Sequence, residues 1–189
     1  SPSSAASDVY KRQPEDEAKE KEKLGWVMKL DVGKGWRRVV PSPDPIGQVE
    51  IEAIKRMVEA GIVVIASGGG GIPVVDGTEL RGVDAVIDKD LAGERLATSL
   101  NAEVYMILTD VEKVAINFKR PGERFLDVMT LEEARMYYEE GHFPPGNKGP
   151  KVKAAMRFVE RTGRLAIITS LDKVVDALDG KTGTRIVPK

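Results

Sequence analysis

Three uninterrupted apolar runs constrain the fold of this chain more than any other feature. They read IVVIAS at 62–67, VYMILTDV at 104–111 and LAIITS at 165–170. Continuous runs rich in β-branched residues are typical of strands buried on both faces of a parallel sheet. The segments between them have helical periodicity, so we expect a doubly wound α/β fold. Its sheet would be mostly parallel, with helices on both faces.

The helices are indicated by amphipathic spacing and by their end signals. Segment 48–61 ends at Gly61 and places four apolar residues on one face: Ile51, Ile54, Met57 and Val58. Segments 90–103, 151–163 and 171–180 also predict helices, and TRIV at 184–187 predicts a final strand. Thr130 and Glu133 have the spacing of a capping box, which predicts a helix over 131–141.

The N-terminal part has a different pattern. Residues 1–13 show no periodicity and are expected to be non-native or disordered. Residues 14–43 predict the end of a helix and a β-hairpin over 26–40, around the turn VGKG. Residues 44–189 are expected to form the main α/β domain, with a short β excursion formed by IPVV, the turn Asp76-Gly77 and VDAVI.

Composition excludes several kinds of chemistry. The 189 residues carry a net charge of −1 and include no cysteine and one histidine, His142. Thiol nucleophiles, thiolate metal sites and zinc sites built on several histidines are therefore excluded, and His142 is interpreted as a loop residue. No apolar run reaches the ~20 residues that span a bilayer. Near-zero charge gives no reason to expect nucleic acid or an anionic membrane as partner. The remaining polar residues suit phosphoryl transfer.

Glycines follow the first apolar run directly, in the stretch SGGGGIP. The four are Gly68, Gly69, Gly70 and Gly71. Neither a Walker A loop nor a dinucleotide fingerprint fits, because no Gly-Lys-Ser/Thr follows and Pro73 stands where the third fingerprint glycine would be. Their amides could form an anion-binding nest, or the stretch could be a tight structural turn.

Two further segments bring lysines to helix starts beyond strand ends. Asp88, Lys89 and Asp90 precede a helix expected to start near Leu91, and they are interpreted either as a solvated cap or as a phosphate contact. The second segment pairs LTDV with GNKGPK, in which Lys151 opens a helix. A cation there conflicts with the helix dipole unless an anion lies between them, which favours a phosphate ligand.

Several blocks of the sequence closely resemble carbamate kinases, of the amino acid kinase superfamily. They include RRVVPSPDP, VIASGGGGIPVV, GVDAVIDKDLAGERLA, ILTDVEKVAINF, GPKVKAAMRFVE and LDGKTGTRIV. The resemblance runs from about Glu15 to the C-terminus. It implies reversible phosphoryl transfer between ATP and carbamate, giving ADP and carbamoyl phosphate. It also implies Mg²⁺ held mainly by phosphate oxygens, without a dedicated protein metal site.

The resemblance also implies roles for individual residues. Lys89 and Lys151 would contact the nucleotide phosphates and the transferred phosphoryl group, and Asp90 would orient the lysines. The remaining nucleotide-binding and phosphate-binding residues would be Gly68, Gly69, Gly70, Gly71, Asp88, Thr109, Asp110, Val111, Gly146 and Pro150. The family further implies a cytoplasmic homodimer that acts in arginine metabolism on a small-molecule substrate.

Two departures from the family pattern change what is expected of this chain. The N-terminal strings resembling GGNA and HGNGPQ do not occur, so the chain corresponds to the C-terminal, nucleotide-binding portion and is expected to be inactive alone. The loop that normally resembles GSMGPK reads GNKGPK, with Lys148 in place of methionine. Two alternatives stay open: another small-acid kinase of the superfamily, or a non-catalytic nucleotide-binding module.

Overall fold

A computed structural model describes residues 9, 11–75, 77–144 and 148–189 of the chain. Its contacts divide the chain into two units, which are described separately. The first unit comprises Ser1–Asp44 and Gly69–Asp88, and the second comprises Pro45–Gly68 and Lys89–Lys189. Residues 69–88 thus group with the N-terminal segment, whereas the sequence analysis expected them in the main α/β domain.

The first unit contains the expected hairpin, which is confirmed. Strands β1 (Val27–Asp31) and β2 (Gly35–Val39) pair antiparallel, with Val27 opposite Val39 and Asp31 opposite Gly35. Helix α2 (Glu15–Lys23) precedes them, and a second small hairpin pairs β3 (Val74–Val75) with β4 (Arg81–Gly82). The β excursion therefore forms, but its second strand ends before VDAVI, whose Val83–Ile87 segment is not a strand.

The second unit is built on a four-stranded sheet in the order β5-β9-β10-β8. Its strands are β5 (Val104–Thr109), β8 (Val128–Thr130), β9 (Leu165–Ser170) and β10 (Thr184–Val187). Strands β5 and β9 are parallel, as are β8 and β10, whereas β9 and β10 are antiparallel. The small hairpin of β6 (Ala115–Ile116) and β7 (Arg124–Phe125) lies outside this sheet.

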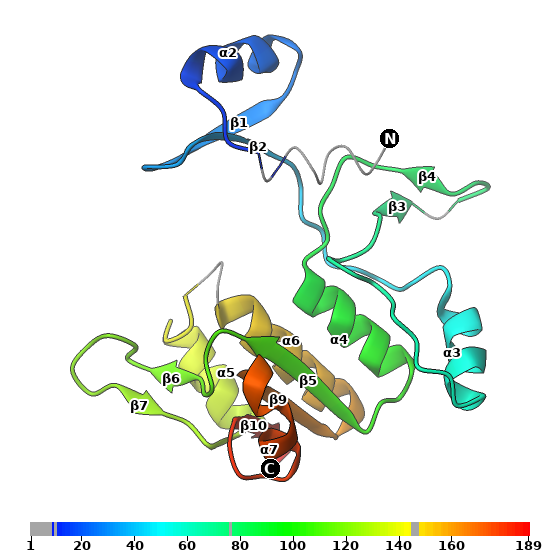
Figure 1. Cartoon of the computed structure of the whole chain (residues 1–189), viewed down its shortest axis with the longest axis vertical. Coiled ribbons are helices and arrows are strands. Elements are labelled where there is room, and N and C mark those ends of the chain that lie inside the picture. Colours follow the sequence, from blue (N-terminus) through cyan, green and yellow to red (C-terminus); the bar gives the residue numbers. More distant parts are fainter. Residues whose placement is uncertain (1–8, 10, 76, 145–147) are drawn as a thin grey trace. The chain divides into compact units, whose positions relative to one another are not determined.

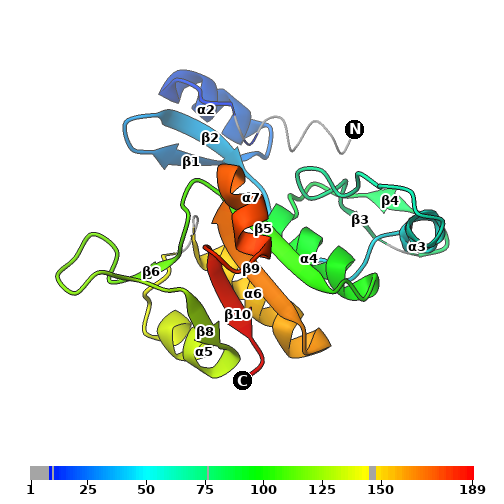
Figure 2. The same cartoon turned by 60° about the horizontal axis from the view of Figure 1, so that its bottom comes forward.

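Helices cover both faces of this sheet, as expected. Helix α6 (Lys148–Thr162) runs behind β5 and β9 in both views, and α7 (Val174–Leu178), entered through the 3₁₀ turn Leu171–Lys173, lies in front of them (Figures 1 and 2). Helix α4 (Lys89–Ser99) packs along α6, and α5 (Leu131–Glu139) packs on the other side of α6. The capping box of Thr130 and Glu133 that starts α5 is present as predicted.

The core of the second unit lies between the sheet and α6. Phe158, Val152 and Val159 on α6 are buried against the sheet strands. Ile167 and Ile168 of β9 are also inaccessible to solvent. The second and third apolar runs therefore form strands β5 and β9, as predicted. Their packing against α6 positions the end of β5 and the start of α6.

The first apolar run does not form the predicted strand. Residues 62–67 have no strand structure and pair with no described residue in a sheet, and Val63 and Ile65 are 92% and 97% exposed. Helix α3 (Ile51–Glu59) before this run is likewise uncovered, since only Ile54 of its four predicted apolar positions is buried. A β-branched run becomes a strand only where a neighbouring strand accepts its backbone hydrogen bonds, and the described chain supplies none here.

Candidate functional site

The first turns of α4 and α6 meet through a buried ion pair. Asp90 lies in the first turn of α4 and Lys151 in the first turn of α6. The Lys151 Nζ donates to the Asp90 Oδ2 at 2.9 Å, and the two residues are 8% and 7% exposed. Lys89 Nζ lies 3.8 Å from the same oxygen, on a side chain that is largely exposed. The three residues predicted as catalytic are therefore brought together by these two helix starts.

A tyrosine from β5 supports the start of α4. The Tyr105 hydroxyl donates to the backbone carbonyl of Asp90 at 2.7 Å, and its ring packs 5.5 Å from that of Phe158. A Cβ at Gly93 would lie 2.9 Å from the Tyr105 oxygen, so this helical glycine leaves room for the hydroxyl. Sequence reasoning missed both supporting residues. The signal was a glycine inside a helix, which has an energetic cost and therefore often has a packing reason.

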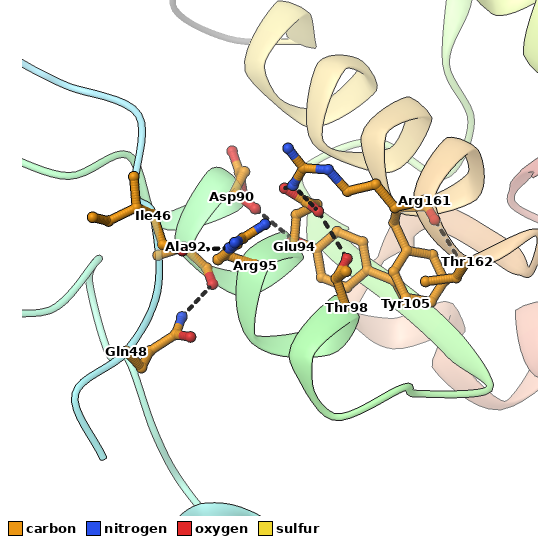
Figure 3. A network of polar contacts seen from close by, with 11 residues as sticks. Ile46, Gln48, Asp90, Ala92, Glu94, Arg95, Thr98, Tyr105, Arg161 and Thr162 are labelled. Carbon is orange, nitrogen blue, oxygen red and sulfur yellow. Dashed lines mark hydrogen bonds and ion pairs between the residues drawn. The ribbon is translucent and has the colours of Figure 1, made fainter. Parts of the chain in front are cut away.

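One turn further along, a second ion pair joins the same helices (Figure 3). The Glu94 carboxylate is fully buried and accepts two hydrogen bonds from Arg161 Nη1, at 2.8 and 3.0 Å, and one from the Thr98 hydroxyl at 2.8 Å. On the opposite side of α4, the figure shows Arg95 and Gln48 tying the segment before α3 to α4. Arg95 donates to the carbonyl of Ile46, and Gln48 donates to that of Ala92. The Glu94–Arg161 pair thus holds α4 against α6, and the contacts of Arg95 and Gln48 hold α4 to the segment before α3.

The first turn of α6 contains a glycine and a proline, and the position of each explains why it is tolerated there. Gly149 donates to the Pro144 carbonyl at 3.1 Å, and a Cβ there would lie 3.0 Å from that oxygen, so a side chain would require the carbonyl to shift slightly. Pro150 follows it, where a missing N–H is tolerated because no helical carbonyl precedes it. The helix begins at Lys148, three residues before the predicted start. Gly146, a predicted nucleotide contact, lies outside the described residues.

Lys148 is an enclosed ammonium that sequence reasoning noted but did not assign to the site. The residue is 6% exposed, and its Nζ has no hydrogen-bond partner among the described residues. The ammonium lies 3.8 Å from the centroid of the Phe118 ring. Burial holds the pKa of Lys148 below its ordinary value, against the opposing charges of Asp110 and Glu123.

The end of β5 presents the segment Thr109, Asp110 and Val111. The Thr109 hydroxyl donates to the Asp110 Oδ1 at 2.9 Å, and the Asp110 side chain is exposed. This hydrogen bond and one from the Asp110 backbone amide hold the pKa of Asp110 below its ordinary value. The charges of Lys148 and Lys151 act in the same direction. Asp110 is therefore ionised at neutral pH, and its negative charge is attracted by the two lysines at the start of α6.

The glycine cluster divides between the two units. Gly68 belongs to the second unit, whereas Gly69, Gly70, Gly71 and Asp88 belong to the first, so their association with Lys151 stays a prediction. At Gly70 the close approach is made by the chain itself, because a Cβ there would lie 2.2 Å from the carbonyl oxygen of Ile87. Gly68 and Gly71 have positive φ angles of 47° and 85°, with nothing within 4 Å of an added Cβ. The tight-turn interpretation accounts for Gly70.

Three lysines gather at the two helix starts of the second unit. Lys89, Lys148 and Lys151 face the carboxylates of Asp90 and Asp110. Both helix N-termini add partial positive charge from their free amides. Such an arrangement suits an anionic ligand with several negative oxygens. Among residues 9, 11–75, 77–144 and 148–189, no group of three or more His, Cys, Asp or Glu could hold a metal ion. Nor is any helix in that part of the chain long and apolar enough to cross a membrane.

Comparison with known proteins defines the class. A profile of the amino acid kinase family matches residues 16–170. The chain belongs to this family.

The relatives it resembles are carbamate kinases. It is 59% identical over 166 residues to the carbamate kinase of Pyrococcus furiosus, an alignment that covers 87% of this chain and 52% of that protein. It is 58% identical over 171 residues to that of Thermococcus kodakarensis, covering 90% and 53%. The solved carbamate kinase of Giardia lamblia bound to AMP-PNP matches with 47% identity and a TM-score of 0.87, covering 94% of this chain and 57% of that one. The chain spans about half the length of the curated relatives it matches.

Proposed function

We propose that this chain is the nucleotide-binding part of a carbamate kinase, which transfers a phosphoryl group reversibly between ATP and carbamate. The observation that carries the proposal is the buried Asp90–Lys151 ion pair at the paired starts of α4 and α6. The likeness to carbamate kinases supports the assignment to carbamate rather than to another small acid. The AMP-PNP in the Giardia lamblia protein supports a nucleoside triphosphate as ligand.

In this proposal, the lysines neutralise phosphate charge. The Lys151 ammonium is held by Asp90, so it is already oriented when the phosphate arrives. Lys89, on an exposed side chain 3.8 Å from the same carboxylate, is free to move toward the transferred phosphoryl group. Positive groups fixed around an in-line transfer lower its barrier because they stabilise charge on the equatorial oxygens.

The other predicted contacts are assigned to the same ligand. We assign Thr109, Asp110 and Val111, with Pro150 and Gly146, to the adenosine side. The glycines Gly68, Gly69, Gly70 and Gly71, with Asp88, are assigned to the phosphoryl end. Mg²⁺ would enter with the nucleotide and would neutralise phosphate charge with few protein ligands.

The carbamate site is assigned to the part of the relatives that this chain does not match, so we expect no turnover by the chain alone. A non-catalytic nucleotide-binding module is the second candidate. We further propose that the whole protein acts as a cytoplasmic homodimer in arginine metabolism.

Calorimetric titration of ADP with Mg²⁺ tests the proposal, with circular dichroism to show that the chain is folded. We expect saturable binding that weakens in Lys89→Ala and Lys151→Ala. Unchanged affinity in both variants would refute the assignment of these lysines. A coupled assay for ATP formation from carbamoyl phosphate and MgADP then separates the two candidates. Turnover by a chain extended to the relatives' full length supports the kinase, and its absence supports the module.

A further inference from the structure

Lys148, in the first turn of α6, has no role in the function proposed above. Lys148 and Lys151 are three residues apart, which places both on one face of the helix. Lys151 reaches a carboxylate, whereas the Lys148 ammonium makes no hydrogen bond to the described chain and is enclosed over the Phe118 ring. Two enclosed cations thus share the positive end of one helix.

A purely structural role does not explain this arrangement. The first turn of α6 contains no acidic residue, and the helix dipole disfavours both ammonium groups. Contact with an aromatic ring returns only part of the hydration that a desolvated ammonium loses. A methionine at this position would make the same ring contact without a buried charge. The enclosed lysine therefore destabilises the unliganded chain. A bound anion would offset this cost.

The surrounding charges indicate where that anion would lie. Asp110 and Glu123 attract the Lys148 ammonium and Lys119 repels it, but neither carboxylate hydrogen-bonds to it. The α6 start therefore offers an ammonium that is not committed to an acceptor in the part of the chain that the structure describes. Its unbranched side chain has four rotatable bonds, so the ammonium can leave the ring without movement of the helix.

We propose that Lys148 is a second phosphate-binding lysine of this site. In the free chain its ammonium rests on the Phe118 ring, and on ligand binding it turns to a phosphate oxygen held at the start of α6, next to Lys151. This proposal rests on the proposed function in that the phosphate is expected to belong to a nucleotide. It assigns to Lys148 affinity for phosphate charge rather than for the adenosine moiety.

The test uses calorimetry on the whole chain with ADP, adenosine and pyrophosphate as separate probes. Lys148→Met removes the charge but keeps the length of the side chain and its ring contact. We expect ADP affinity to fall about tenfold or more, as for loss of a charge-assisted hydrogen bond, while adenosine affinity stays unchanged. The salt dependence of ADP binding should also weaken, because fewer charges are paired.

Two further variants separate charge from folding. Lys148→Arg keeps the positive charge and should lose less ADP affinity than Lys148→Met. Lys153→Met removes a lysine from the opposite side of the same helix and should leave ADP affinity unchanged. Circular dichroism of each variant reports whether it has folded.

The outcomes distinguish this inference from the proposed function. If the chain binds ADP and Lys148→Met binds it equally well, the inference is overturned and the proposed function stands. If the chain binds pyrophosphate but not ADP, and Lys148→Met loses pyrophosphate, the phosphate site stands and the nucleotide function falls. If the folded chain binds neither probe, both are overturned.

Discussion

Two ion pairs join α4 to α6, and their surroundings differ. The Glu94–Arg161 pair has balanced charge, with one carboxylate and one guanidinium, and the carboxylate accepts two hydrogen bonds from the guanidinium and one from Thr98. Arg161 also keeps contact with water, at 39% side-chain exposure. At the Asp90–Lys151 pair both partners are buried, and further lysines crowd the same helix starts. The first pair holds two helices together, and the second lies where we propose that a ligand binds.

The largest effect on stability is expected at the balanced pair. Glu94→Ala leaves the Thr98 hydroxyl and the Arg161 guanidinium without their acceptor and opens a cavity between the helices. We expect a loss of about 3 kcal/mol in unfolding free energy, or roughly 6–12 °C in melting temperature. Thermal unfolding followed by circular dichroism measures it. A loss below about 1 kcal/mol would show that this pair does not hold the helices together.

A smaller loss that responds to anions is expected at the other pair. Asp90→Asn removes the carboxylate that compensates Lys151, so we expect about 2 kcal/mol of destabilisation. Pyrophosphate at constant ionic strength should restore part of this loss, because an anion can replace the missing negative charge. Glu94→Ala is the control and should gain no more from pyrophosphate than the unmodified chain. Equal recovery in both variants would remove the distinction between the two pairs.

The smallest effect is a gain in stability at Lys148. Replacing this enclosed ammonium by methionine should raise the unfolding free energy by about 1 kcal/mol near neutral pH. The pKa of Lys148 is lowered in the folded chain, so the folded state binds its proton less tightly than the unfolded state. The cost of the charge is therefore complete below the folded pKa and disappears as pH rises from there to the ordinary value.

The stability advantage of Lys148→Met should accordingly narrow at alkaline pH. Urea unfolding of both proteins at neutral pH and near pH 10 measures this difference. Lys153→Met serves as the matched control, with no comparable gain expected. A gap that widens with pH would contradict the burial argument for Lys148.

Local sequence signals predicted the central sheet of the second unit and its helices well. The runs at β5 and β9, the capping box at Thr130 and the glycine after α6 all specify structure through neighbouring residues. The predicted strand at 62–67 was wrong because strand formation depends on a partner strand, which no local pattern reveals. Apolar composition was the same kind of evidence for all three runs, but among the described residues only the runs at β5 and β9 have a neighbouring strand.

The lysines of the candidate site could be predicted because they stand at helix starts, where a cation is unusual. The unusual lysines at 89 and 151 indicated an anion, whereas the role of Asp90 as their shared carboxylate was implied by the resemblance to carbamate kinases. Tyr105 and Gly93 were not predictable as a pair, since a contact between β5 and α4 depends on the tertiary fold. Gly70 shows the opposite limit, because its glycine is explained by the Ile87 carbonyl and needs no ligand.

The central claim is that nucleotide phosphates bind at the starts of α4 and α6. Two-dimensional ¹H–¹⁵N NMR of the chain during titration with ADP tests it most directly. We expect the largest saturable shifts at the amides of Lys89, Gly149 and Lys151, and small ones at Glu94 and Arg161. Shifts that saturate elsewhere in the second unit, or a folded chain whose spectrum ADP leaves unchanged, would contradict the account.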